Sequence, residues 1–439
     1  MRFFDREKEI KRLHEIAEIS KKSAQFTVVT GRRRIGKTQL LLKATEGEPT
    51  LYFFVSRKAE PFLCQDFQQE IADKLNIPVL GDVTSFGKLF QFLIQVSFER
   101  SFHLIIDEFQ EFLNINPSIY SDIQHFWDLN KEKSRMNLIV CGSVFSLMHK
   151  IFKDYKAPLF GRATAFMQVS PFKVAVLKEI LGEMHPNYQS EDLLALFTFT
   201  GGVAKYVQLL ADNRALKFNK MLDFMIREDS PFITDGKNML IDKFGKDYTI
   251  YFTILSSIAR GDNTRGQIEA CTGKEIGGYL TRLEQDYGLI CKNIPIFSRS
   301  ETKNVRYVLN DNYLMFWFRF VYKYAYMIEI GQYDELKRVI MRDYATFSGK
   351  MLERYFREKS IETGGITQIG SYWDKTGENE IDMITVNEMD KTAQIVEIKR
   401  NKNHIRYNLL KEKAQNMMNK KHSLKGYQIE YKGFSMDDM

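Results

Sequence analysis

The chain has 439 residues, a length that predicts about three domains rather than one core. Hydrophobic residues make up 44% of it and charged residues 27%, which is ordinary for globular domains and argues against a disordered or low-complexity protein. The formal net charge of +7 is compatible with a polyanionic partner but does not require one.

Cysteine usage and apolar runs indicate a cytoplasmic protein. The cysteines are far apart and form no CxxC pattern, which argues against a zinc site or a disulfide framework and favours a reducing compartment; they are Cys64, Cys141, Cys271 and Cys291. The first residues, MRFFDREKEIKRL, are charged and contain no apolar signal region. The most apolar stretch, 313–327, contains Arg319 and Lys323, so it predicts a buried aromatic helix rather than a membrane span.

The strongest motif begins at Phe26, where the β-branched run FTVVT (26–30) leads into GRRRIGKT and then into the helical pattern QLLLKA. A strand, a glycine loop and a helix in this order predict a phosphate-binding P-loop. Glycines at both ends let successive backbone N–H groups point at phosphate oxygens, and the helix adds its positive amino-terminal end. The predicted ATP-binding residues are Gly31, Arg32, Arg33, Arg34, Ile35, Gly36, Lys37 and Thr38.

Within this loop, Lys37 is expected to reach the β- and γ-phosphates, and Thr38 to offer its hydroxyl to Mg²⁺. Arg32 to Arg34 either add positive potential or are solvated loop arginines. A second element supports the motif, because LIIDE (104–108) is an apolar strand that ends in two carboxylates. Asp107 is expected to hold Mg²⁺ through water and Glu108 to polarise the attacking water, as in hydrolysing ATPases.

Two more residues follow predicted strands. Ser143 ends the apolar run LIVCGS (138–143), where it is either a sensor of the γ-phosphate or lytic water, or the N-cap of the next helix. Arg162 precedes a fifth predicted strand at 164–171. It is a candidate charge-neutralising arginine, acting on its own nucleotide or on a neighbour's, and the competing reading is a surface salt bridge.

These motifs together resemble a known family. FFDREKEIKRL resembles the segment near adenine in AAA-like and STAND-like ATPases, and GRRRIGKT, LIIDEFQ, LIVCGSVFS, PLFGRAT and TGGVAKY occur in the order of the archaeal-type ATPase family. The resemblance implies a parallel sheet with strand order 5-1-4-3-2, followed by a helical lid to about residue 240. In the last motif Ala204 replaces the family's proline, and Lys205 is either a phosphate contact or an exposed helical lysine.

Residues 247–309 predict a winged helix: helices in 247–259, 263–273 and 274–290, then strand-like runs at 289–297 and 305–311 around a polar loop. In such modules the third helix enters the DNA major groove. The candidate contacts are Lys274, Tyr279, Thr281, Arg282, Arg299 and Lys303. Acidic residues offset the charge of the third helix, so a protein-contact role is the alternative.

The last hundred residues contain a weaker constellation. Asp382 enters a predicted strand, and the paired strand carries Glu397-Ile398-Lys399, the pattern of PD-(D/E)xK nucleases. The period of two points Glu397 and Lys399 to one face. Asp382, Glu397 and the Ile398 carbonyl are candidate Mg²⁺ ligands, Lys399 would stabilise phosphate charge or position water, and Glu353 would complete the acidic cluster from a helix. A basic segment, 399–425, suits a phosphodiester backbone or is simply a solvated face.

The sequence thus predicts an α/β fold with several domains. They are a P-loop ATPase domain (1–180), a helical lid (181–240), a winged helix-turn-helix (241–312), a helical linker (313–345) and a nuclease-like domain (346–439). The leading hypothesis is an ATPase that uses ATP and Mg²⁺ to control DNA binding or cleavage, with no membrane partner and with homo-oligomers as a compatible state. The alternatives are a STAND-like signalling or defence scaffold that binds protein, and an inactive nuclease-like domain that only docks DNA.

Overall fold

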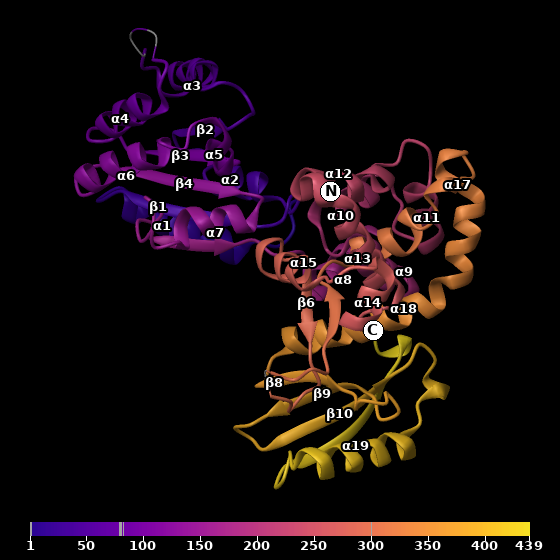
Figure 1. The fold of residues 1–439 in the computed structure, drawn as a ribbon. Helices are drawn as coiled ribbons and strands as arrows, with labels where there is room; N and C mark the ends of the chain where they lie inside the picture. Colours follow the sequence, from indigo (N-terminus) through magenta and orange to yellow (C-terminus); the bar gives the residue numbers. More distant parts are fainter. Residues whose placement is uncertain (1, 79–80, 82, 300) are drawn as a thin grey trace. The chain divides into compact units, whose positions relative to one another are not determined.

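The computed structural model describes residues 2–78, 81, 83–299 and 301–439. It divides into two compact units (Figure 1). One runs from Asp5 to Pro171, and the other comprises Phe172–Met439 together with residues 2–4. Each unit is described by itself.

The first unit contains a five-stranded parallel sheet in the order β2-β3-β4-β1-β5. This confirms the predicted order 5-1-4-3-2. The strands are β1 (Gln25–Thr30), β2 (Thr50–Phe54), β3 (Phe102–Asp107), β4 (Met136–Gly142) and β5 (Ala165–Gln168). Every residue of β3 and β4 is buried, as expected for central strands of a parallel sheet covered on both faces. All five carboxyl ends therefore meet at one edge of the sheet.

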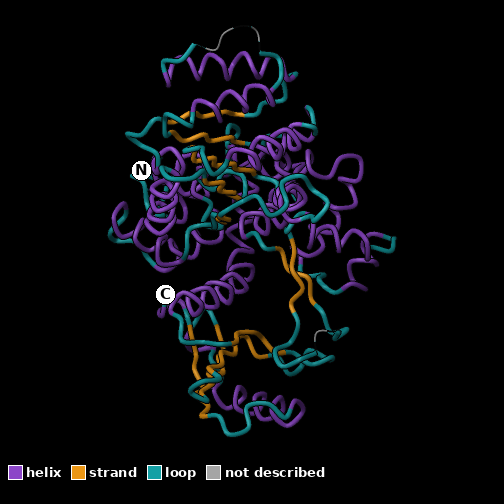
Figure 2. The backbone as a smooth tube through the Cα atoms, turned by 90° about the vertical axis from the view of Figure 1, so that its left-hand side faces the viewer, coloured by secondary structure: helices purple, strands orange, loops and turns teal. Residues whose placement is uncertain are grey.

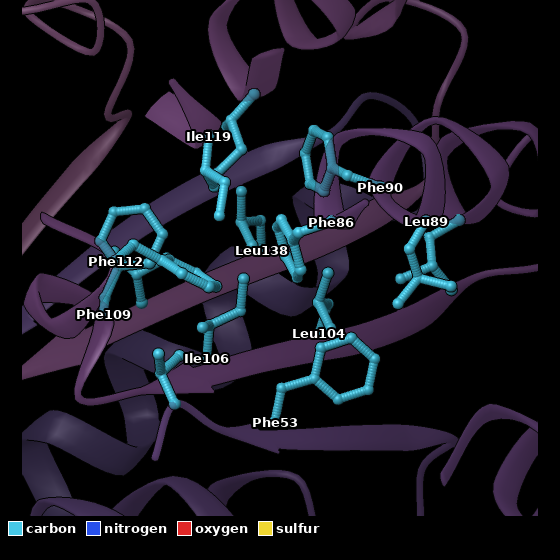
Figure 3. Close-up of a cluster of buried hydrophobic side chains, with 14 of the residues drawn as sticks. Phe53, Phe86, Leu89, Phe90, Leu104, Ile106, Phe109, Phe112, Ile119 and Leu138 are labelled. Carbon is cyan, nitrogen blue, oxygen red and sulfur yellow. The ribbon is translucent and has the colours of Figure 1, made fainter. Parts of the chain in front are cut away.

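Helices cover this sheet. They are α1 (Glu7–Ser20), α2 (Lys37–Ala44), α3 (Glu60–Leu75), α4 (Phe86–Val96), the short pieces Phe109–Glu111 (3-10) and α5 (Phe112–Ile115), α6 (Ile119–Asn130) and α7 (Phe145–Lys153). A large apolar core joins the sheet to them (Figure 3). In it, Leu104, Ile106 and Leu138 of the central strands pack against rings such as Phe86 and Phe112. This core holds the strands in place, and with them the edge of the sheet where their carboxyl ends meet.

The second unit is mainly helical before its own sheet. Its first helices are α8 (Val174–Met184), α9 (Ser190–Thr200), α10 (Ala204–Asp212), α11 (Phe218–Met225) and α12 (Pro231–Phe244), followed by a 3-10 turn, Gly245–Asp247. Gly201 and Gly202 end α9 in the left-handed region. A side chain at Gly202 would collide with the backbone carbonyl of Phe172, so this close approach requires glycine.

Next come three helical segments and a hairpin, in the order predicted for 247–309. They are α13 (Tyr248–Arg260), α14 (Arg265–Thr272), α15 (Gly277–Thr281) continuing as a π-turn over Arg282–Asp286, and the antiparallel strands β6 (Ile290–Asn293) and β7 (Arg306–Leu309). Both strands are shorter than the predicted runs. The polar loop between them was predicted as 298–304, and residue 300 of it lies outside the described residues.

The aromatic stretch 313–327 is helical but not one continuous helix. It comprises α16 (Asn312–Phe316), a π-turn (Trp317–Tyr322) and part of α17 (Ala325–Glu329). Its first half is buried as predicted, with Trp317 and Phe318 in the core, whereas Tyr326 is exposed. No helix of the described part of the chain has both the length and the apolar character needed to cross a membrane.

The chain ends in a four-stranded mixed sheet, order β11-β10-β9-β8, between two helices (Figures 1 and 2). Its elements are α18 (Tyr333–Thr363), β8 (Gln368–Tyr372), β9 (Ile381–Asn387), β10 (Thr392–Ile398), a 3-10 turn (Lys402–His404), α19 (Tyr407–Lys421), β11 (Gln428–Phe434) and a last 3-10 turn (Met436–Asp438). On one face Phe356 of α18 stacks on Phe434, and on the other Leu410 of α19 packs with Ile395. Two layers of helix thus enclose the sheet.

Candidate functional site

The glycine loop lies where sequence reasoning placed it, between the carboxyl end of β1 and the first turn of α2. Gly36 (φ 93°) and Arg34 (φ 70°) adopt left-handed conformations that turn the backbone inward. Gly31 has no room for a side chain, because a Cβ there would lie 2.7 Å from the Val169 carbonyl oxygen. Ile35 is buried and anchors the loop, while the side chain of Arg33 is exposed.

Lys37 is folded back over the loop. Its Nζ donates to the carbonyl oxygens of Gly31 at 2.9 Å and Arg32 at 3.2 Å. The residue is 7% exposed, and burial lowers the pKa of its ammonium group. A buried cation whose hydrogen bonds go to neutral carbonyls gains much from an anionic ligand. The loop is therefore electrostatically prepared for phosphate.

Asp107 is the centre of a buried hydrogen-bond network at the same edge. Its Oδ2 accepts from the hydroxyls of Thr38 and Tyr52, each at 2.7 Å. Its Oδ1 accepts from the Cys141 thiol at 2.9 Å and the Glu108 N–H at 2.8 Å. Burial raises the pKa of Asp107, but the hydrogen bonds outweigh it and hold the pKa below the usual value. The carboxylate is thus charged beside the Thr38 hydroxyl.

Glu108 follows at the end of β3 in a left-handed conformation (φ 54°). Its Oε2 accepts from the Ser143 hydroxyl at 2.8 Å and also from the Gln110 amide. Ser143 is therefore in contact with the candidate water-polarising carboxylate, and it is not the N-cap of the next helix, because the N-cap of α7 is Val144. The structure brings Lys37, Thr38, Asp107, Glu108 and Ser143 to one edge of the sheet.

Arg162 lies elsewhere in this unit. Its guanidinium pairs with Asp128 at 3.0 Å, the surface salt bridge weighed in the sequence analysis, and donates to the Phe160 carbonyl at 2.7 Å. It precedes β5, and the nearby Thr164 binds Phe26 at the start of β1. In a parallel sheet this is the amino-terminal edge, opposite the edge that carries the P-loop. The fold therefore does not place Arg162 beside its own chain's P-loop.

Three partners of the nucleotide edge were missed by sequence reasoning: Tyr52, Cys141 and Gln110. Tyr52 lies on β2, next to β3, and Cys141 lies on β4, on the other side of β3. Strand adjacency is a tertiary property, so their residue types alone gave no signal. A polar side chain on a strand that neighbours β3 is the pattern that would have found Tyr52 and Cys141, whereas Gln110 lies on the 3-10 turn that follows Glu108.

We expect Tyr52→Phe to weaken this edge modestly. The change removes one hydroxyl donor from Asp107 and leaves the donors from Thr38, Cys141 and Glu108 in place. A single hydrogen bond to a charged group contributes about 1.5–3 kcal/mol. Its removal corresponds to roughly a tenfold to hundredfold loss of Mg²⁺-dependent ATP hydrolysis. Steady-state ATP hydrolysis at varied Mg²⁺ will measure it, and unchanged kinetics would show that the Tyr52 hydroxyl does not act on Asp107.

A second cluster lies in the carboxyl-terminal sheet, where β9 and β10 meet. Lys399 Nζ lies 2.9 Å from Asp382 Oδ2 and 3.6 Å from Glu397 Oε1. Asp382 Oδ2 also accepts from the Ile398 N–H at 2.8 Å, and Glu397 Oε2 from the Arg406 N–H at 2.7 Å. Burial lowers the pKa of Lys399, but the hydrogen bond and charge of Asp382 reverse this and raise it. The predicted trio is therefore assembled and Lys399 is a cation.

Glu353 approaches this cluster from α18. Burial, followed by the negative charge of Asp382, raises the pKa of Glu353 to about 8. It is within electrostatic reach of Asp382, yet the described residues contain no group of three or more His, Cys, Asp or Glu side chains placed to hold a metal ion. The expectation that Glu353 completes a three-carboxylate cluster is therefore not met.

The other candidate contacts are surface residues of the second unit. Lys205 is exposed on α10, as are Lys274, Thr281 and Arg282 on the third helical segment and Arg299 and Lys303 in the hairpin loop, while Tyr279 is partly buried. In the basic segment 399–425, helix α19 buries Leu410, Ala414 and Met417 against the sheet, while its lysines Lys411 and Lys420 are exposed and Lys413 and Lys421 are partly buried.

The sheet, the glycine loop and the carboxylates at the end of β3 define a P-loop ATPase domain. An ATPase domain found predominantly in Archaea matches residues 3–210, and a domain known from archaeal and bacterial proteins of unknown function matches residues 317–417. An uncharacterised protein of Methanocaldococcus jannaschii is 30% identical over 407 residues, covering 90% of this chain and 87% of that protein. The chain belongs to this family of archaeal ATPases and binds ATP through its P-loop domain.

One solved structure supports the fold. The Walker-type ATPase of Pyrococcus abyssi is 20% identical, with a TM-score of 0.56 over 72% of this chain and 96% of that one. The Aeropyrum pernix ORC2 protein is 12% identical, with a TM-score of 0.46 over 76% of this chain and 94% of its own. At 20% identity the likeness to the Pyrococcus abyssi protein concerns the fold alone.

Proposed function

We propose that the protein hydrolyses ATP to control DNA binding, and magnesium-dependent DNA cleavage, by its carboxyl-terminal module. One observation carries the proposal: the Lys399 ammonium lies 2.9 Å from Asp382 and 3.6 Å from Glu397 in a protein that also carries a complete P-loop. A cation between two carboxylates at a strand end is an arrangement suited to phosphodiester chemistry. Nothing in nucleotide hydrolysis itself requires this second cluster.

Magnesium fits the nucleotide edge. The Thr38 hydroxyl and the Asp107 carboxylate are 2.7 Å apart, and Asp107 is 5% exposed, so an oxygen donor set suited to Mg²⁺ is already assembled. A bound Mg²⁺ would neutralise charge on the β- and γ-phosphates. In hydrolysis, Lys37 binds phosphate oxygens, Glu108 takes up a proton from water, and Ser143 orients Glu108.

Magnesium also fits the second cluster, where two carboxylates and one backbone carbonyl are available. Asp382 and Glu397 supply carboxylates and Ile398 a carbonyl oxygen, and Mg²⁺ commonly keeps several water molecules when bound by one or two carboxylates. The backbone N–H groups of Ile398 and Arg406 hold the two carboxylates in place. Lys399 would then stabilise negative charge that develops on the scissile phosphate.

Charge around this cluster favours a nucleic acid as the ligand. The segment 399–425 contains nine lysine and arginine residues and one acidic residue, Glu412. Phosphate contacts of this kind supply most of the non-specific affinity for DNA. The three helical segments and hairpin at 248–309, with the element order of a winged helix, would add a second contact region.

A protein-binding scaffold of the STAND-like kind is the second candidate. It is favoured by the third helical segment, where Glu284 neutralises Lys292 at 2.8 Å instead of leaving that cation free for phosphate. A third candidate is a nuclease-like domain that docks DNA without cleaving it. It shares DNA binding with the first candidate and lack of cleavage with the second. Arg162 has no role on its own nucleotide in this proposal, because it pairs with Asp128 at the edge of the sheet away from the P-loop.

The experiment is a supercoiled-plasmid assay with Mg²⁺, with and without ATP, on the wild type, Lys37→Ala and Lys43→Ala. Lys43 is an exposed residue of the same helix, α2, and serves as the matched control. We expect the wild type and Lys43→Ala to nick DNA at a rate that ATP alters, and Lys37→Ala to lose the ATP response. If the wild type neither binds nor cuts DNA in any nucleotide state, the proposal is wrong.

A further inference from the structure

The hairpin β6–β7 does not project freely as a wing, because its loop packs against the carboxyl-terminal sheet. After β6 the chain leaves the hairpin, and the Ile296 N–H donates to the Ser371 carbonyl oxygen at 2.9 Å, alongside the edge strand β8. Ile296 is buried in the same apolar cluster as Tyr372 and Leu410. Gly370 makes room for it, since a Cβ at that position would lie 2.9 Å from the Ile296 Cβ.

Polar contacts fix the other side of the loop. The Trp373 indole donates to the Asn304 side chain at 2.9 Å, and the Arg306 guanidinium stacks 4.5 Å from the Trp373 ring. The same guanidinium pairs with Glu380 at 2.6 Å. Glu380 is two residues before Asp382, so the hairpin is held next to the strand that enters the Lys399 cluster. The ribbon shows the hairpin reaching this sheet at β8 (Figure 1).

The end of α19 meets the hairpin loop at the same place. Lys421 Nζ donates to the Ser298 hydroxyl at 3.0 Å, and Phe297 packs on the cluster that contains Leu424. Exposed cations of the loop and of the helix end are therefore neighbours. We define the hairpin–helix surface by its basic side chains: Arg299, Lys303, Lys420, Lys421 and Lys425. The acids beside them are Asp374, in an exposed pair with Lys420 at 3.4 Å, and Glu301.

We propose that the hairpin–helix surface is a single site for the phosphate backbone of one DNA duplex. The proposal rests on the proposed function and specifies where its DNA lies. Long lysine and arginine side chains in solvent suit phosphate, whereas protein interfaces are depleted in lysine and are anchored mainly by Trp, Tyr and Arg. Among the described residues of 290–309 and 420–427, no large hydrophobic side chain is exposed. The docked loop also fixes the distance between this duplex and the Lys399 cluster.

Binding of a labelled 20-base-pair duplex at varied salt, in EDTA to prevent cleavage, tests the proposal on the full chain. The variants are a loop pair, Arg299→Ala with Lys303→Ala, a helix pair, Lys420→Ala with Lys425→Ala, and all four changes together. Lys421 is kept because it holds the loop. The control pair is Lys8→Ala with Lys11→Ala, two exposed lysines of α1. Thermal unfolding of each variant confirms that the fold is kept.

Each phosphate contact contributes about 0.9 to the slope of log affinity against log salt. We expect each pair to reduce the slope by about 1.8 and the four changes by about 3.6, with one duplex bound per chain. The control pair should leave the slope unchanged. The single surface is refuted if the wild type binds DNA and the loop and helix pairs show the same salt slope as the wild type. It is also refuted if two duplexes bind per chain. In both cases the proposed function stands. Absence of any DNA binding by the wild type refutes both.

Discussion

Replacing Glu108 by glutamine will leave ATP bound and lower its hydrolysis by about a hundredfold to ten-thousandfold, the usual contribution of a general base. Glutamine has the same shape as glutamate, and its amide oxygen still accepts from the Ser143 hydroxyl, which lies 2.8 Å from the native carboxylate. The Glu108 N–H that supports Asp107 is a backbone group and is not altered. The variant loses the carboxylate charge and with it the ability to take a proton from water.

The measurements are the ATP dissociation constant and the single-turnover hydrolysis rate with saturating Mg²⁺. Glu111→Gln is the matched control, because Glu111 lies on the 3-10 turn that directly follows Glu108 and contacts Arg57 and Asn114 instead of the nucleotide edge. We expect Glu111→Gln to behave as the wild type and Glu108→Gln to bind ATP within a few-fold of it. Hydrolysis by Glu108→Gln at the wild-type rate would show that another group activates the water.

The nucleotide edge was predictable because its parts are contiguous in the chain. Gly31 to Thr38 connect one strand directly to one helix, so the residues that surround phosphate follow from local sequence. Asp107 and Glu108 end a strand whose apolar run marks it as buried, and parallel strands bring their carboxyl ends to one edge. The order β2-β3-β4-β1-β5 matched the order implied by the family resemblance.

Contacts across the sheet were not predictable in the same way. Tyr52 reaches Asp107 because β2 and β3 are neighbours, and Cys141 does so because β4 lies on the other side of β3. Arg162 shows the reverse problem. Its place between the fourth and fifth strands was correctly recognised, but only the sheet's direction reveals that this place is at the edge away from the P-loop.

The hairpin illustrates how a distant partner changes a local pattern. Residues 289–297 alternate as a strand should, yet β6 ends at Asn293. Ile296 is apolar, and the core formed by β8, β9 and α19 offers it burial that a two-stranded ribbon does not. The strand that Ile296 contacts, β8, begins at Gln368, more than sixty residues later in the chain. No pattern within the hairpin sequence predicts this contact.

Replacing Lys399 by alanine will lower DNA cleavage by about a hundredfold to a thousandfold and change DNA affinity little, if the carboxyl-terminal cluster is a nuclease site. Removing one preorganised group that stabilises transition-state charge typically has this effect on the rate. Asp382 keeps its hydrogen bond from the Ile398 N–H, and Glu397 keeps that from Arg406, so both carboxylates stay in position. Lys399 is 37% exposed at its side chain, which limits the cost of its removal to folding.

The rate of plasmid nicking at saturating DNA, measured beside DNA affinity, separates the two effects. Lys391→Asn is the control, because Lys391 is a cation at the opposite end of the same strand and asparagine tolerates its left-handed conformation (φ 53°). We expect Lys391→Asn to cleave as the wild type does. Equal cleavage by Lys399→Ala would exclude the cluster as the nuclease centre. If the wild type and Lys399→Ala bind DNA equally and neither cleaves it, the result would instead favour a docking domain. In such a domain the Asp382–Lys399 pair only joins two strands.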